Sequence, residues 1–226
     1  MKTQTLTRAF TMIELVFVII VIGIISALAI PRFDRNNLRE AADQLVSHIR
    51  YTQHLAMQDN KFDPSNADWF RSRWQIRFHR TVDTVEVWSY SIFSDRAGYS
   101  GEPDEPELAT NPTNAEQYLT GGFSGGVITL TSPKRLETMA LGEKYGITGV
   151  LFSATCSNNT GINQSRRLSF DSMGRVFQGD MSNVASWTDP YQADKIIQAQ
   201  CTIQLSTDSD TLTIAIEPET GYTHIL

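Results

Sequence analysis

The sequence predicts an α+β protein in which a long, kinked N-terminal helix packs on an antiparallel β-sheet. Three observations lead to this prediction. Residues 10–31 are almost entirely apolar, residues 32–60 repeat apolar side chains every three or four positions, and residues 61–226 contain short stretches of alternating polarity separated by turn residues. We therefore expect a leader at 1–9, a helix in two halves, and a β-rich globular domain from residue 61 onward.

The apolar segment from Phe10 to Ile30 contains 21 residues and a single charge, Glu14. A helix of this length spans about 30 Å, the thickness of the hydrocarbon core of a membrane. The segment argues against an ordinary soluble cytoplasmic protein and predicts a single membrane-spanning helix. Lys2 and Arg8 precede the segment, and basic residues of this kind stay in the cytoplasm. The N-terminus is therefore expected inside the cell, and the chain after Arg32 outside the membrane.

Three kinds of segment are compatible with these residues: a secretory signal peptide, a plain anchor, and a helix that serves first as an anchor and then as a structural element. The triplet Ala27-Leu28-Ala29 resembles the end of a signal peptide. Glu14 favours the third kind, because a carboxylate near the bilayer centre costs about 2.5–3.5 kcal/mol and the other two kinds have no use for one. A cut between Ala9 and Phe10 would place a new α-amino group one helical turn from Glu14.

The leader KTQTLTRA and the following FTMIELVFVIIVIGIISALAIP resemble the N-terminal motif of type IV prepilins. The resemblance comprises a short basic leader, a small residue at Ala9, Phe10 at the cut, Glu14, and an apolar helix that ends at Pro31; Ala9 stands where glycine is usual. It implies that a prepilin peptidase cleaves before Phe10 and methylates its amino group. It also implies that Glu14 neutralises the amine of a neighbouring subunit during assembly.

Residues 32–60 continue the helix, with Leu38 and Leu45 among the apolar side chains that share one face. Gly23 and Pro31 interrupt the helix, and in a helix interior they cost about 1 and 3 kcal/mol. Many membrane helices tolerate both residues without a functional reason. The two positions match those of pilins, and this resemblance favours a functional kink at each.

The rest of the chain reads as short strands separated by turns. The predicted strands are Trp74–Phe78, Val85–Phe93, Val127–Leu130, Val150–Thr155, Leu168–Phe170 with Val176 and Phe177, Ile196–Leu205, Leu212–Ile216 and Tyr222–Ile225. No helical pattern separates them, so one antiparallel sheet is expected. Residues 94–126 contain three prolines and many acidic residues, which predicts an exposed loop or insertion.

Four later segments resemble GspH/FimT-type minor pseudopilins and minor pilins. They are AADQLVSHIRYTQHLAMQDNKF, WQIRF, RRLSFDSMGRV and LTIAIEPETGYTHI. The two resemblances together imply a structural subunit, without enzymatic activity or cofactor, of a type II secretion pseudopilus or a type IV pilus. Its partners would be other pilins or pseudopilins, the prepilin peptidase and an inner-membrane assembly platform, and its globular domain would lie in the periplasm of a bacterium.

The only two cysteines, Cys156 and Cys201, lack the spacing of a metal site and predict one disulfide in an oxidising compartment. Such a bond would join the end of one hairpin layer to the last strands of the sheet. Two separate buried thiols remain the alternative, because cysteine also behaves as a small apolar residue.

Other functions rest on weaker patterns. The segment 122–126 matches the G-x-S-x-G motif of hydrolases, with Ser124 as nucleophile and His224 downstream, but a β-like stretch follows where a helix is required. The rival function is a membrane-anchored domain that binds a ligand or DNA, since some FimT-like proteins bind DNA and three arginines lie close together, Arg166, Arg167 and Arg175. The net charge of −6 disfavours nucleic acid. The four histidines are dispersed, and Asp208 and Asp210 lack an EF-hand spacing, so no metal is expected.

Overall fold

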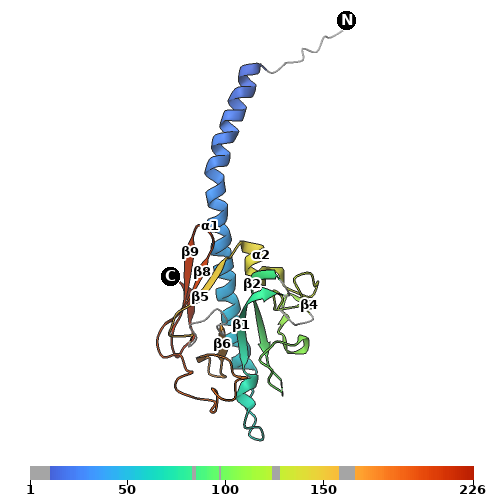
Figure 1. Ribbon diagram of the computed structural model, residues 1–226, viewed down its shortest axis with the longest axis vertical. Coiled ribbons are helices and arrows are strands. Elements are labelled where there is room, and N and C mark those ends of the chain that lie inside the picture. The colour runs from blue at the N-terminus through green and yellow to red at the C-terminus, as the bar shows by residue number, and fades with distance from the viewer. Residues whose placement is uncertain (1–10, 83–84, 97, 124–127, 158–165) are drawn as a thin grey trace. The chain divides into compact units, whose positions relative to one another are not determined.

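A computed structural model describes residues 11–82, 85–96, 98–123, 128–157 and 166–226, without the side chains of 27–36 and 81. The chain divides into two compact units, Met1–Asn36 and Asn37–Leu226. The helix α1 (Met12–Gln58) contributes to both units and is the long coil in Figure 1. It is helical through Gly23 and Pro31, and the functional kink expected at these residues stays a prediction.

Ten strands in the described residues form three antiparallel sheets. The first sheet has the order β2-β1-β6-β7 and consists of β1 (Trp74–Val82), β2 (Val85–Ser94), β6 (Arg167–Phe170) and β7 (Val176–Gln178). The second sheet has the order β10-β9-β8-β5 and consists of β5 (Gly149–Phe152), β8 (Cys201–Ser206), β9 (Thr211–Ile216) and β10 (Thr223–Ile225). The third sheet pairs β3 (Thr110–Asn111) with β4 (Asn114–Tyr118). Four short helices complete the unit: η1 (Trp69–Ser72), η2 (Glu105–Glu107), η3 (Glu137–Met139) and α2 (Leu141–Tyr145).

The predicted fold class, a long kinked helix packed on one antiparallel sheet, is therefore wrong. The strands are divided among three sheets, and the residues of α1 before Asn37 belong to a different compact unit from the strands. The alternation of apolar residues predicts which face of a strand is buried, but it contains no information about which strand lies beside it. β5 pairs with β8, and β6 pairs with β1. Both pairings join strands that are far apart in the sequence, and they place these strands in two separate large sheets.

Two local predictions also fail. The first concerns the predicted strand at 127–130. Residues 128–130 pair with no other strand, and Val127 lies outside the described residues. The acidic segment 94–126 is not simply an exposed loop, because it contains η2, β3 and β4 and buries Leu108 and Leu119. The amide of Leu119 donates to the carbonyl of Ala109, and its own carbonyl accepts from Ile92 in β2. Backbone hydrogen bonds of this kind tie the segment to the edge of the first sheet.

The core of the second unit forms between α1 and both large sheets. The buried side chains of α1 recur every three or four residues, as its amphipathic pattern requires: Leu38, Ala41, Ala42, Leu45, Ile49 and Ala56. They pack with Ile76 of β1, Leu168 of β6 and Ile203 of β8 in one cluster. Side chains of α1 add polar contacts: Nδ1 of His48 lies 2.7 Å from the Tyr90 hydroxyl, and Arg50 donates to the Thr223 carbonyl at 2.6 Å.

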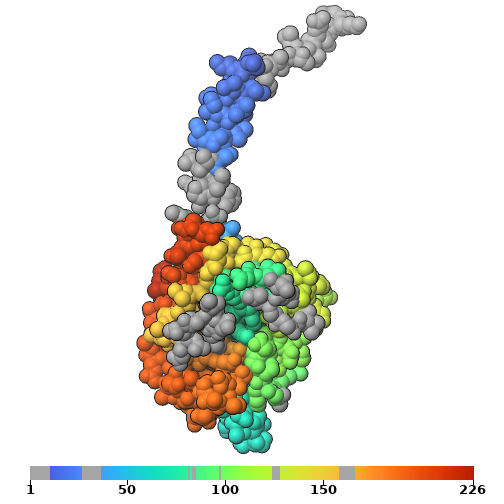
Figure 2. Space-filling model, viewed as in Figure 1, coloured from blue at the N-terminus to red at the C-terminus, as the bar shows by residue number. Residues whose placement is uncertain are grey.

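A second, smaller cluster lies at η1, where Phe70 stacks on Trp187 with ring centroids 5.9 Å apart. The guanidinium of Arg71 is buried beside it and donates to the carbonyls of Met181 and Trp187. These bonds hold the irregular segment after β7 against η1, and Figure 2 shows the two segments in orange and teal.

Candidate functional site

The most unusual surface of the protein is the N-terminal part of α1. Eleven large apolar side chains between Met12 and Ile25 are 47–84% exposed: Met12, Ile13, Leu15, Val16, Phe17, Val18, Ile19, Ile20, Ile22, Ile24 and Ile25. They occupy nearly every position, so the helix is apolar all round; Figure 2 draws this part of the helix in blue. A helix of this type requires a cover of lipid or of other protein. We call residues 12–25 the apolar helix surface.

Within the described residues, none of the helices combines the length and the apolarity that crossing a bilayer demands. These residues include 11–26 of the predicted span, but not Phe10 or the side chains of 27–31. The membrane anchor expected at 10–31 stays a prediction.

Glu14 lies in the first turn of the apolar helix surface and caps the helix together with Thr11. Its carboxylate accepts hydrogen bonds from the amide of Thr11 at 2.9 Å and from the Thr11 hydroxyl at 3.0 Å. The Glu14 amide donates in turn to the Thr11 hydroxyl at 3.3 Å. This reciprocal arrangement is a capping box, and the T-x-x-E pattern of residues 11–14 would have revealed it in the sequence. Ala9 and Phe10, the predicted processing residues, lie outside the described part of the chain.

Gly23 lies within the same surface, and a Cβ added there would meet no other described atom within 4 Å. Close packing within this chain therefore gives no reason for glycine at this position. The side chain of Pro31 is not among those described.

The predicted disulfide between Cys156 and Cys201 is present, with Cα atoms 5.3 Å apart and both residues fully buried. Cys156 follows β5 and Cys201 begins β8, and these two strands pair directly, with Phe152 opposite Ile203. The bond therefore closes the end of this strand pair and joins the end of β5 to the sheet that contains the last strands, β8, β9 and β10.

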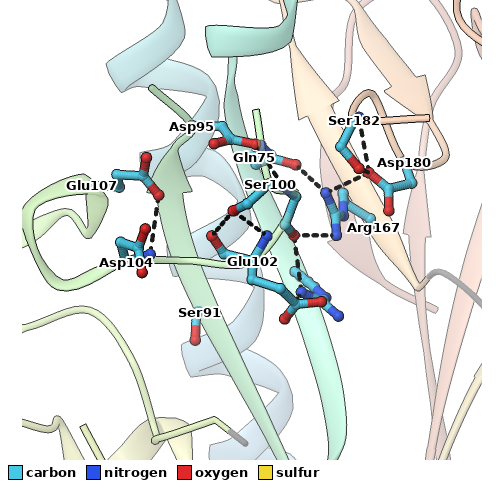
Figure 3. A network of polar contacts seen from close by, with 12 residues as sticks. Gln75, Ser91, Asp95, Ser100, Glu102, Asp104, Glu107, Arg167, Asp180 and Ser182 are labelled. Atoms are coloured by element: carbon cyan, nitrogen blue, oxygen red, sulfur yellow. Dashed lines mark hydrogen bonds and ion pairs between the residues drawn. The ribbon is translucent and has the colours of Figure 1, made fainter. Parts of the chain in front are cut away.

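The three arginines of the predicted basic cluster point to different places. Arg167 is buried and contacts Asp180 at 2.9 Å and the Gly101 carbonyl at 2.6 Å, as Figure 3 shows. Arg175 forms an ion pair with Asp171 at 2.7 Å, and Arg166 lies over the Trp88 ring at 4.6 Å. Because two of the three charges are paired, these arginines do not form one accessible basic patch.

The residues considered for hydrolysis or metal binding do not form a site in the described part of the chain. Ser124 lies outside the described residues, and His224 stacks on Tyr222 with ring centroids 5.3 Å apart. In the described part of the chain, no group of three or more His, Cys, Asp or Glu side chains is placed to hold a metal ion. The apolar helix surface with Glu14 is therefore the candidate functional site.

No protein-family model, curated protein or solved structure matches the chain.

Proposed function

We propose that this protein is a structural subunit of a type II secretion pseudopilus or of a type IV pilus, and that it assembles through the apolar helix surface. The observation that carries the proposal is the exposure of apolar side chains on all sides of α1 from Met12 to Ile25. Burying such side chains gains about 25 cal/mol for each Å² of apolar surface, which favours association with other apolar helices. The prepilin-like leader identifies those helices as the equivalent segments of other pilins or pseudopilins.

In this proposal a prepilin peptidase cleaves the chain before Phe10 and methylates the new amino group. Glu14 then neutralises the amine of a neighbouring subunit, since an unpaired charge inside a bundle of apolar helices is costly. Until an inner-membrane assembly platform takes up the subunit, lipid covers the apolar helix surface and the unit from Asn37 to Leu226 lies in the periplasm. The Cys156–Cys201 disulfide supports an oxidising location for that unit.

The proposal assigns no catalytic step to the chain, whose role is to pack against other subunits. The rival function, capture of DNA or another ligand by an anchored domain, draws no support from the arginines. Arg167 is 1% exposed and Arg175 is paired with Asp171, so neither is available to phosphates without disrupting the fold.

Cysteine cross-linking in cells that assemble the filament tests the proposal. We expect the full chain with Ile20→Cys to form disulfide-linked adducts with itself or with other subunits that carry the same substitution at the matching helical position. Glu86→Cys is the matched control, because its side chain is exposed and lies on β2, in the other compact unit. Equal cross-linking of the two variants contradicts assembly through residues 12–25.

Mass spectrometry of the protein from the same cells tests processing. The proposal requires a mature chain that begins with methylated Phe10. A chain that begins at Ile30 would instead identify residues 1–29 as a signal peptide and would remove the apolar helix surface from the mature protein.

A further inference from the structure

A cavity of about 400 Å³ opens between η1, the start of β1 and the segment that follows β2. Its lining includes the rings of Trp69 and Trp74, the carboxylates of Asp95 and Glu107, and Lys61. All these residues belong to the unit from Asn37 to Leu226, and none takes part in the proposed assembly. We call this space the Trp69–Asp95 cavity.

The two carboxylates of the cavity are buried without a cation of their own. Asp95 is 3% exposed and Glu107 is 7% exposed. One oxygen of Asp95 accepts from the Gly101 amide at 2.8 Å, and the described residues offer no hydrogen-bond donor to the other oxygen. Glu107 accepts from the amides of Arg96 and Asp104 at 2.8 and 3.0 Å, the second of which is drawn in Figure 3. Among the described residues no lysine or arginine forms an ion pair with either carboxylate.

The two indole rings of the cavity already attract cations from their own chain. The ammonium of Lys61 lies 5.3 Å from the centroid of the Trp74 ring, and the guanidinium carbon of Arg73 lies 5.2 Å from that of the Trp69 ring. Tryptophan is the strongest aromatic partner for such groups. The lining holds two basic side chains: Lys61 is paired with Asp59 at 2.5 Å, and the guanidinium of Arg96 donates to the Pro106 carbonyl at 2.6 Å, so neither forms an ion pair with Asp95 or Glu107. The cavity therefore combines aromatic walls with two buried carboxylates that form no ion pair with the described residues.

We propose that the Trp69–Asp95 cavity binds an alkylammonium group, with the ammonium held by Asp95 and Glu107 and the methylene chain against the two indoles. An ammonium supplies three donors, which suits carboxylate oxygens whose present donors are backbone amides. Its aliphatic chain buries apolar surface against tryptophan, and its volume is well within the cavity. Two sources share this chemistry, a free amine and the lysine side chain of a partner protein.

The charge of Asp95 makes this binding dependent on pH. Burial raises the pKa of Asp95 to about 6, with a smaller raising effect from Glu107 of η2 and Asp180 of the segment after β7. The Gly101 amide and Arg167 of β6 act in the opposite direction. Asp95 is therefore mostly protonated at pH 5 and mostly ionised at pH 7.5, so the affinity for an ammonium is expected to rise about tenfold between these values.

The test uses the full-length, isotope-labelled protein in a non-ionic detergent, because residues 12–25 expose apolar side chains. We expect n-butylamine hydrochloride to shift the indole N–H resonances of Trp69 and Trp74 and to leave that of the fully buried Trp187 unchanged. Asp95→Asn should weaken binding at pH 7.5 at least about tenfold and abolish its pH dependence. Asp63→Asn is the matched control, because Asp63 lies in the lining but is exposed and accepts hydrogen bonds from Ser65.

The second arm titrates the peptide acetyl-Gly-Lys-Gly-amide under the same conditions. Tighter binding of the peptide supports a partner lysine as the source, and tighter binding of n-butylamine supports a free amine. The proposal is overturned if 1-butanol binds as tightly as n-butylamine, or if methyl glucoside or calcium binds more tightly. It is also overturned if Asp63→Asn loses as much affinity for n-butylamine as Asp95→Asn does. If Asp95→Asn does not fold, the wild-type protein decides, since affinity that is the same at pH 5 and pH 7.5 contradicts the role of Asp95. All these outcomes are independent of filament assembly.

Discussion

Arg167 and Asp180 form an ion pair with a nitrogen–oxygen distance of 2.9 Å, in which the arginine side chain is 2% exposed and the aspartate 34%. The same guanidinium donates to the Gly101 carbonyl at 2.6 Å and to the amide oxygen of Gln75 at 3.2 Å (Figure 3). One side chain of β6 thus joins β1, the segment after β2 and the segment after β7. Burial lowers the pKa of Arg167 to about 10, which still leaves it charged at neutral pH.

Replacing Arg167 by methionine should therefore cost stability without affecting an external ligand. Removing one partner of a buried ion pair typically costs about 3–5 kcal/mol, and we expect about 3 kcal/mol here, because Asp180 is 34% exposed and keeps its hydrogen bonds from Ser182. Urea denaturation followed by circular dichroism measures the loss. Arg166→Met is the matched control: Arg166 neighbours Arg167 in sequence, forms no ion pair with any other residue that the structure describes, and lies over Trp88, so we expect a loss of about 1 kcal/mol or less. Equal losses would contradict the structural role of Arg167.

Glu14 has two separable roles, the cap seen in the structure and the proposed pairing with an amine. Glu14→Gln keeps an oxygen that can accept from Thr11 but removes the charge, whereas Thr11→Ala removes the hydroxyl of the cap and keeps the charge. If the charge matters, Glu14→Gln should reduce incorporation into filaments about tenfold, because an amine would remain unpaired among apolar helices. Thr11→Ala should assemble nearly normally. Immunoblots of sheared filaments measure incorporation, and the reverse order of the two variants would assign the effect to the cap.

His48 should make the protein less stable as the pH falls from about 6.5 to about 4. Burial lowers the pKa of His48 from 6.5 to about 4, and its Nδ1 lies 2.7 Å from the Tyr90 hydroxyl. In this window the unfolded chain binds more protons than the folded one, so the free energy of unfolding falls with pH, by roughly 3 kcal/mol in all. Above pH 6.5 this contribution is fully present.

The measurement compares urea unfolding of the wild-type protein and His48→Gln between pH 7 and pH 4. The pKa of Asp95 is raised to about 6, so this residue makes the free energy of unfolding rise as the pH falls, over a pH range that overlaps that of His48. The informative quantity is therefore the difference in the free energy of unfolding between the wild-type protein and His48→Gln. That difference should shrink as the pH falls. His54→Gln is the control, because His54 is exposed on the same helix, and it should retain the wild-type slope. A difference independent of pH would show that His48 does not titrate with unfolding.

The Cys156–Cys201 disulfide should stabilise the second large sheet. The two cysteines are 45 residues apart, and the loop-entropy relation assigns such a bond about 4 kcal/mol as an upper value. Cys156→Ala combined with Cys201→Ala should lower the free energy of unfolding and should increase hydrogen exchange first at the paired strands β5 and β8. Wild-type protein unfolded in dithiothreitol should show a comparable loss. An unchanged midpoint with reductant would mean that the cysteines are not joined in solution.

Local features of the chain were predictable from the sequence, because neighbours within one turn or one strand decide them. The apolar run at 12–25, the amphipathic face with Leu45, and the strands that begin at Trp74 and Val85 all follow from residue spacing. The T-x-x-E cap at Thr11 was equally readable but was overlooked. The one possible disulfide followed from there being only two cysteines.

The tertiary structure alone decided how the strands share three sheets and what becomes of the charged residues. Arg166 and Arg167 look equivalent in the sequence, but Arg166 directly precedes β6 and lies over Trp88, whereas Arg167 begins β6 and enters the interior to meet Asp180. Asp95 and Glu107 belong to a segment whose composition predicts exposure, and both are buried because the segment folds back on the first sheet. These outcomes depend on contacts between residues far apart in the chain, and the local pattern of polarity contains no record of those contacts.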